Sequence, residues 1–147
     1  MLDNITSSTE KVSLSRRIGI MFYDVILLIA VLFFASLIFV LPTQITYGHP
    51  LYFLYVIYIY VAAFIFYGWF WTHGGQTLGL STWRVQLLSD QEDHVTWKQA
   101  FIRYTVSLLS WLALGVGYLW VYTNKERLAW NDIASKTRLR RISKISD

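Results

Sequence analysis

The chain has 147 residues, of which 55% are hydrophobic, 18% aromatic and 15% charged, and its formal net charge is +4. Because a soluble domain usually carries about 25% charged residues, this composition is typical of a membrane protein, and the length suits one domain. Cysteine is absent, which excludes disulfides and thiolate metal sites.

A polar lead at 1–15 precedes the first apolar run, which occupies 18–41. This run has 24 residues and a single charged one, Asp24. As a helix it would be about 36 Å long, enough to cross a bilayer core of about 30 Å. The apolar core of a cleaved signal peptide is only about 7–15 residues long. We therefore interpret the run as a retained membrane helix.

Asp24 is the most informative residue of this helix, because it would lie about 9 Å inside the apolar run. An ionised carboxylate at such a depth costs about 2–3 kcal/mol, so it needs a partner in the protein. Arg17 lies seven residues earlier and shares the same helix face. The two are about 10 Å apart along the axis, too far for an ion pair. Each is thus predicted to have a partner elsewhere in the chain.

The second apolar run, at 51–71, contains 21 residues without a charge, and eleven of them are aromatic. Tyr52, Tyr55 and Tyr58 recur every three residues and form a stripe on one face. We interpret Tyr52 and Tyr55 as interface anchors and the other aromatic residues as packing between helices; the alternative is that the tyrosine hydroxyl groups line a transport path. The run predicts a second membrane helix.

Beyond the second run, the segment 72–79 has three glycines, which predict a tight turn, and it matches no phosphate-binding pattern. Residues 83–88 alternate weakly and predict a short strand. Thr96 can cap a helix that carries Arg103 and continues into an apolar stretch at 104–123. Gly115 and Gly117 interrupt this stretch and favour a turn there.

The thirteen lysines and arginines distinguish two topologies. Six precede residue 104, seven follow residue 123, and none lies between the first two spans. If 104–123 crosses the membrane, the charges are split between the two sides, which does not satisfy the positive-inside rule. If it is a re-entrant helical hairpin, which we favour, all thirteen lie in the cytoplasm with both termini. The expected fold is an all-α membrane protein with two transmembrane helices, a third segment that is re-entrant or spanning, and β pairing of 83–88 with 138–142.

The sequence resembles the RDD family of small bacterial integral membrane proteins over about 13–142. The family's charged residues, one arginine and two aspartates, fall on Arg17 (or Arg16), Asp24 and Asp132. Where many relatives have a histidine before the late aspartate, this chain has Asn131. The resemblance implies a membrane domain at 16–142 followed by a tail at 143–147. It rests on Arg16-Arg17 with Asp24, Gly75-Gln76-Thr77-Leu78-Gly79, Arg84-Val85, Arg103 and the segment from Arg127 to Thr137.

The resemblance also implies a protein of the bacterial inner membrane, and some relatives are linked to cation/proton exchange. One hypothesis is a transporter or transporter subunit, working as an oligomer, in which Asp24 exchanges a proton for a cation and Arg103 biases its protonation. The other is a non-transporting adaptor in which Arg17, Asp24, Arg103 and Asp132 form a structural charge network. Its basic tail would bind anionic lipid or a protein partner; the tail comprises Lys136, Arg138, Arg140, Arg141 and Lys144.

The depths of the charged residues along their helices predict how they pair. Asp24 and Arg103 would lie at similar depths and are expected to form an ion pair, which leaves Arg17 within reach of Asp132. We expect no enzyme activity, cofactor or metal, because the sequence contains no set of nucleophile, base and acid, no metal-ligand motif and no cofactor motif. A basic tail beside a membrane segment favours lipid over nucleic acid.

Overall fold

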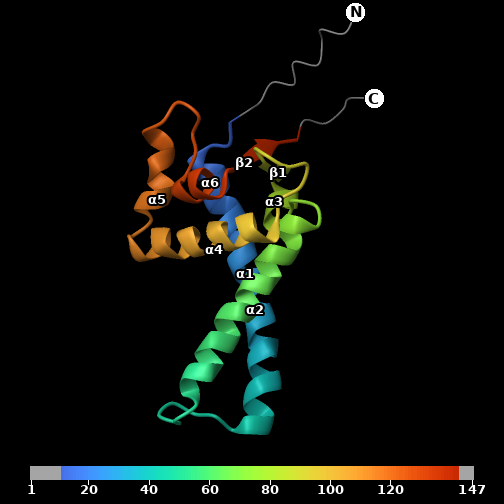
Figure 1. Ribbon diagram of the computed structural model, residues 1–147, viewed down its shortest axis with the longest axis vertical. Helices are drawn as coiled ribbons and strands as arrows, with labels where there is room; N and C mark the ends of the chain where they lie inside the picture. Colours follow the sequence, from blue (N-terminus) through green and yellow to red (C-terminus); the bar gives the residue numbers. More distant parts are fainter. Residues whose placement is uncertain (1–10, 143–147) are drawn as a thin grey trace, which may run out of the picture.

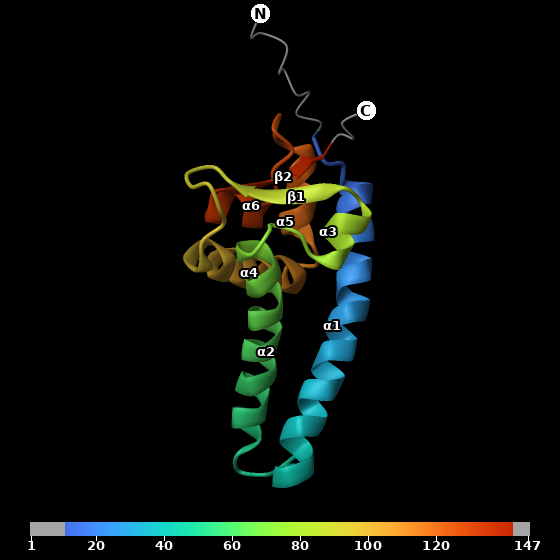
Figure 2. The same ribbon diagram turned by 90° about the vertical axis from the view of Figure 1, so that its right-hand side faces the viewer.

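The computed structural model describes residues 11–142, and two long helices dominate it. Helix α1 spans Leu14–Thr43 and helix α2 spans Tyr52–Thr72, and both are long and apolar enough to cross a membrane. They form a hairpin, here called the arm, that extends away from the other elements (Figures 1 and 2). The arm confirms the two predicted membrane helices. Helix α1 includes Pro42 in its last turn.

Tyrosines of α2 connect the two helices of the arm. The hydroxyl groups of Tyr55 and Ser36 lie 2.7 Å apart, and the Tyr58 hydroxyl donates to the Ala35 carbonyl at 3.1 Å. A hydroxyl group in hydrocarbon costs free energy unless it is hydrogen-bonded, so these contacts help to hold α1 and α2 together. The packing role predicted for Tyr58 is confirmed, and Tyr55, predicted as an interface anchor, also contacts α1.

The other elements gather at one end of the arm, where α1 begins and α2 ends, and are here called the head (Figure 2). Strands β1 and β2 pair antiparallel with Leu87 opposite Leu139, which confirms the predicted pairing of 83–88 with 138–142 within two residues at each end. The head comprises α3 (Leu78–Thr82), β1 (Val85–Ser89), α4 (Trp97–Leu112), α5 (Val116–Leu119), the 3-10 helix η1 (Trp120–Tyr122), α6 (Trp130–Ser135) and β2 (Thr137–Arg141).

The third apolar segment is broken. Helix α4 and the α5–η1 pair are bent by 108° relative to each other, and Leu114 and Gly115 between them have positive φ angles of 55° and 81°. A left-handed backbone costs glycine little, which explains the break at this position. Helix α4 lies across the arm, and α5 turns back toward the start of α1 (Figures 1 and 2). The interruption predicted at Gly115 is confirmed.

The bend leads to a prediction about membrane sidedness. If the α4–α5 pair enters the membrane and returns, cysteines replacing the exposed residues Gln91 and Glu126 should react with an impermeant reagent from the same side. Tyr47, in the loop between α1 and α2 and 92% exposed, should report the other side when replaced with cysteine. The chain contains no cysteine of its own, so each label reports one position. Labelling of positions 91 and 126 from opposite sides would contradict the re-entrant hairpin and favour a third span.

The buried core lies in the head, where Leu80, Val85, Leu87 and Ala100 pack together. The arm, in contrast, has few buried residues: none of the apolar window of α1 and 11% of that of α2 is buried within the protein. Apolar helices exposed in this way require lipid or another protein around them. The chain is therefore a membrane protein whose arm contacts the bilayer.

The predicted division at residues 15 and 142 falls at the edges of the described chain. The helix begins at Leu14, so the end of the polar lead belongs to α1, and Lys11 forms an isolated bridge with Arg140 of β2. The tail at 143–147, with Lys144 of the proposed lipid-binding set, lies outside the described residues. The division into lead, membrane domain and tail stays a prediction.

Candidate functional site

Three of the four predicted charges form one buried cluster, here called the charge cluster: Arg17, Arg103 and Asp132. Arg17 Nη2 lies 2.8 Å from Asp132 Oδ2, and Arg103 Nη1 lies 2.6 Å from Asp132 Oδ1. The three side chains are only 5%, 6% and 0% exposed, respectively. One carboxylate thus binds two arginines, and the cluster carries a net charge of +1. The predicted proximity of Arg17 and Asp132 is confirmed.

Uncharged groups complete the surroundings of the charge cluster. The Arg127 carbonyl accepts from Arg17 at 3.1 Å, the Thr137 hydroxyl accepts from Arg103 at 3.0 Å, and the Ala129 N–H donates to Asp132 Oδ2 at 3.0 Å. Burial raises the pKa of Asp132, but the guanidinium groups of Arg103 and Arg17, together with the Ala129 N–H, outweigh it and hold the pKa below its usual range. Asp132 is therefore ionised at neutral pH, and both of its carboxylate oxygens accept hydrogen bonds from these partners.

Asp24 lies outside this cluster. Its Oδ2 accepts a hydrogen bond from the Thr77 hydroxyl at 2.6 Å, and its Oδ1 accepts from the Gly79 N–H at 2.9 Å. Its exposed fraction is 5%. Both of these donors are uncharged, and both belong to the turn that begins α3. An ionised carboxylate loses hydration energy when it is buried, and a cationic partner would offset part of that loss. Uncharged donors offset less of it.

The predicted ion pair of Asp24 with Arg103 is wrong. Asp24 instead accepts a hydrogen bond from Thr77 at the start of α3, and Arg103 pairs with Asp132 of α6. Asp24 and Arg103 line the same cavity, but several elements pack around it. Helix α6 lies against α4, and α3 lies against α1, so each charge finds its partner in the element nearest to it.

Gly79 makes the contact between α3 and α1 possible. A Cβ atom at this position would lie 2.5 Å from the Ile20 carbonyl oxygen and 2.7 Å from Asp24 Oδ1. Backbone atoms cannot move aside as a flexible side chain can, so any larger residue would push α3 away from α1. The glycine is thus required for the hydrogen bond that its own N–H donates to Asp24.

This close approach predicts that Gly79→Ala lowers the melting temperature of the detergent-solubilised protein, because overpacking typically costs about 1–3 kcal/mol and the Asp24 contact is also strained. Ser81→Ala, in the same short helix but exposed to solvent, is the matched control and should change stability by less than about 0.5 kcal/mol. Equal melting temperatures for the two variants would show that α3 does not pack on α1 as described.

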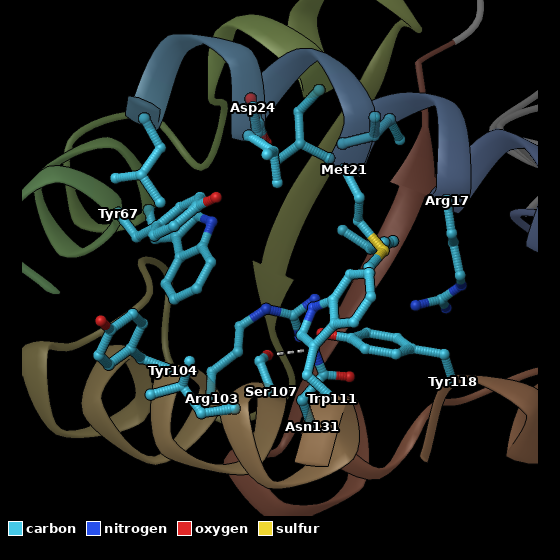
Figure 3. Close-up of a pocket in the computed structure, with 17 residues that line it drawn as sticks. Arg17, Met21, Asp24, Tyr67, Arg103, Tyr104, Ser107, Trp111, Tyr118 and Asn131 are labelled. Atoms are coloured by element: carbon cyan, nitrogen blue, oxygen red, sulfur yellow. Dashed lines mark hydrogen bonds between the residues drawn. The ribbon is translucent and has the colours of Figure 1, made fainter. Parts of the chain in front are cut away.

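A cavity of about 200 Å³ separates Asp24 from the charge cluster. Its walls come from α1, α2, α3, α4, α5, α6 and β2, and Arg17, Asp24 and Arg103 all line it. In Figure 3, Arg103 reaches from α4 toward the middle of the cavity, while Arg17 approaches from α1 at its edge. The Trp71 ring lies 5.5 Å from Arg103 Cζ, a cation–π distance. Polar groups, apolar walls and charges of both signs therefore line one cavity.

Several site residues were not predicted from the sequence. Thr77 and Gly79 hold Asp24, Thr137 holds Arg103, and Asn131 donates to the Ser107 hydroxyl at 2.9 Å on the cavity wall (Figure 3). A signal existed for the first two, since they belong to the Gly-Gln-Thr-Leu-Gly segment that carries the family resemblance. That segment was interpreted only as a tight turn. Backbone donors and hydroxyl groups are too common in sequences to predict a partner for a given carboxylate.

The proposed lipid-binding tail is an ordered strand over most of its length. Arg138, Arg140 and Arg141 belong to β2, and Lys136 precedes it with a left-handed backbone. Arg138 Nε forms an ion pair with Asp90 Oδ1, with side chains that are 52% and 28% exposed. The basic residues thus form one edge of the head rather than a free tail, and lipid contact by them stays a prediction.

Comparison with known proteins identifies the family. The model of the RDD family matches residues 11–136, which is most of the chain. The chain belongs to the RDD family. No curated protein and no solved structure matches it significantly. The RDD match includes all four predicted charges and the Thr77–Gly79 turn, so the charge cluster and the Asp24 contact both lie within the family domain.

Proposed function

We propose that this RDD protein exchanges protons for cations across the bacterial inner membrane and that Asp24 is the exchanging group. The observation that supports this most is that the two buried aspartates have different kinds of partners. Asp132 is neutralised by two arginines, whereas Asp24 faces the cavity and is held by uncharged donors. A carboxylate of the second kind can be neutralised by either a proton or a metal cation, which is the chemistry of exchange.

The hydrogen bonds of Asp24 allow both states. When Asp24 is ionised, the Thr77 hydroxyl donates to Oδ2. When Asp24 carries a proton on that oxygen, rotation of the Thr77 hydroxyl lets Thr77 accept instead, because a hydroxyl group can do either. The Gly79 N–H can donate to Oδ1 in both states. Proton uptake therefore requires no large movement of α3.

The charge cluster has a supporting role in this proposal. Arg103 lines the same cavity as Asp24, but it donates hydrogen bonds to Asp132 and Thr137. Its positive charge thus faces the same cavity without pairing with the Asp24 carboxylate. Because the arm alone leaves both helices exposed, a complete path across the membrane requires several copies of the chain or another membrane protein.

The test is proton movement in liposomes that contain the purified protein and a pH-sensitive dye. A gradient of Na⁺ or K⁺ should change the internal pH with the wild type, and Asp24→Asn should abolish the change while the protein remains folded. Asp90→Asn, which removes a carboxylate on the outer edge of the head, is the matched control and should leave exchange intact. Exchange that persists in Asp24→Asn would exclude Asp24 as the exchanging group.

A second candidate function is that of a non-transporting membrane adaptor. The charge cluster favours it, because three of the four buried charges already satisfy one another and can be explained by structure alone. The exposed apolar arm would then bind a partner protein within the membrane. Absence of proton movement with every cation tested, from a protein shown to be folded in the liposomes, would favour the adaptor.

A further inference from the structure

Helix α4 has one apolar face that is exposed and one face that is buried. The buried face includes Gln99, Arg103 and Ser110. The exposed face is apolar except for Lys98 in the first turn. A broad exposed apolar face on one side of a helix marks a contact with an apolar partner. The exposed apolar residues of α4 are Trp97, Phe101, Leu108, Leu109, Trp111 and Leu112.

The orientation of α4 differs from that of the arm. The helix runs across the direction of α1 and α2, and in both views it lies on the side of the head nearest the loop of the arm (Figures 1 and 2). The rings of Phe101 and Phe64 have centroids 5.5 Å apart, and the Tyr104 hydroxyl donates to the Tyr60 carbonyl at 3.2 Å. Phe64 lies eight residues, or about 12 Å, before the end of α2. Helix α4 therefore packs beside the apolar part of α2 and not beyond its end.

The surroundings of α4 indicate that its partner is bilayer lipid. Leu108 of α4 and Val25 of α1 are both exposed and line the same cavity, so the exposed face of α4 continues the lipid-facing surface of the arm. The polar residues Asp93, before α4, and Lys125, after η1, are exposed at the two ends of this apolar region. The basic strand β2 lies on the far side of the head from the arm (Figure 2). An amphipathic helix between polar ends is typical of a segment that lies along a membrane.

We propose that α4 lies in the plane of the membrane, within the leaflet nearest the head, with its exposed face against lipid acyl chains. Such helices bury their apolar face about 5–10 Å below the headgroups. Trp97 and Trp111, near the two ends of α4, suit this depth because tryptophan is enriched at membrane interfaces. In a re-entrant hairpin or a third span, α4 would instead run along the bilayer normal. The proposal holds whether or not Asp24 exchanges protons.

The experiment measures the depth of single nitroxide labels by electron paramagnetic resonance of the full-length protein in liposomes of phosphatidylethanolamine and phosphatidylglycerol. Depth follows from the ratio of collision rates with oxygen, which dissolves among acyl chains, and with a water-soluble nickel chelate. The chain has no cysteine of its own, so Phe101→Cys and Leu112→Cys each carry one label. The two positions share a helix face and are about 16 Å apart along α4. Their depths should differ by less than about 5 Å, one helical turn.

Helix α1 provides the matched control. Phe22→Cys and Phe33→Cys have the same spacing and are 65% and 59% exposed. Because α1 is long and apolar enough to cross the membrane, their depths should differ by about 15 Å. Lys98→Cys and Leu109→Cys form a second pair of this spacing on α4 that retains the contact between Phe101 and Phe64. Circular dichroism should show that each variant is folded.

Three results would overturn the proposal. A difference in depth within the α4 pairs as large as that in α1 would show that α4 enters the membrane steeply. Low collision rates with oxygen at positions 109 and 112 would show that protein, and not lipid, covers the exposed face. Collisions mainly with the nickel chelate at these positions would place α4 outside the membrane.

Discussion

Asp132→Asn is expected to be among the most destabilising single substitutions in this protein, with a loss of about 3–5 kcal/mol. Asp132 is fully buried and accepts from two arginines at 2.8 and 2.6 Å. The substitution leaves two guanidinium groups, on side chains that are only 5% and 6% exposed, without a counter-charge. The melting temperature of the detergent-solubilised protein, followed by circular dichroism, should fall by many degrees.

Asp90→Asn provides the control, because it removes a carboxylate that also binds an arginine, but at the surface. The side chains of Asp90 and Arg138 are 28% and 52% exposed, and such pairs contribute about 0–1 kcal/mol. The triple change of Arg17→Met, Arg103→Met and Asp132→Leu should recover much of the loss, since apolar residues can replace a buried ionic cluster. Similar melting temperatures for Asp132→Asn and Asp90→Asn would contradict the description of the charge cluster.

Asp24→Ala is the second substitution with a large expected effect. It leaves the Thr77 hydroxyl and the Gly79 N–H without their acceptor at the contact between α3 and α1. A buried donor without a partner costs about 1–3 kcal/mol, and here two donors lose theirs together. The free energy of unfolding, measured by denaturant titration in mixed micelles, should fall accordingly.

A double-mutant cycle identifies the partner of Asp24. Once Asp24 is alanine, Thr77→Val removes a hydroxyl group that no longer has its acceptor, so the double variant should lose much less stability than the sum of the single variants. A coupling energy of about 1–3 kcal/mol is expected. The corresponding cycle of Asp24→Ala with Arg103→Met should give a smaller coupling energy, because Arg103 binds Asp132 instead. A larger coupling energy with Arg103 than with Thr77 would indicate that Asp24 pairs with Arg103 and would contradict the contacts described above.

Much of the architecture follows from local properties of the sequence. Two uncharged or nearly uncharged runs of more than 20 residues can only be accommodated as helices in a bilayer, because every backbone group must be hydrogen-bonded within the segment. Gly115 predicted the break in the third apolar segment, and weak alternation predicted β1. The burial of Arg17, Asp24, Arg103 and Asp132 was also predictable, since charges inside or beside apolar runs need partners in the protein.

The sequence by itself therefore determined which segments are apolar helices, where the third one breaks and which charges must be buried. Only the tertiary structure decided which of these charges meet. The position of a residue along its helix follows from spacing, but its partner depends on which distant element packs against that helix. Arg103 binds Asp132 because α6 lies against α4, and Asp24 binds a backbone N–H that has no signature in the sequence. The cavity arises in the same way, because it is the space that seven packed elements leave unfilled.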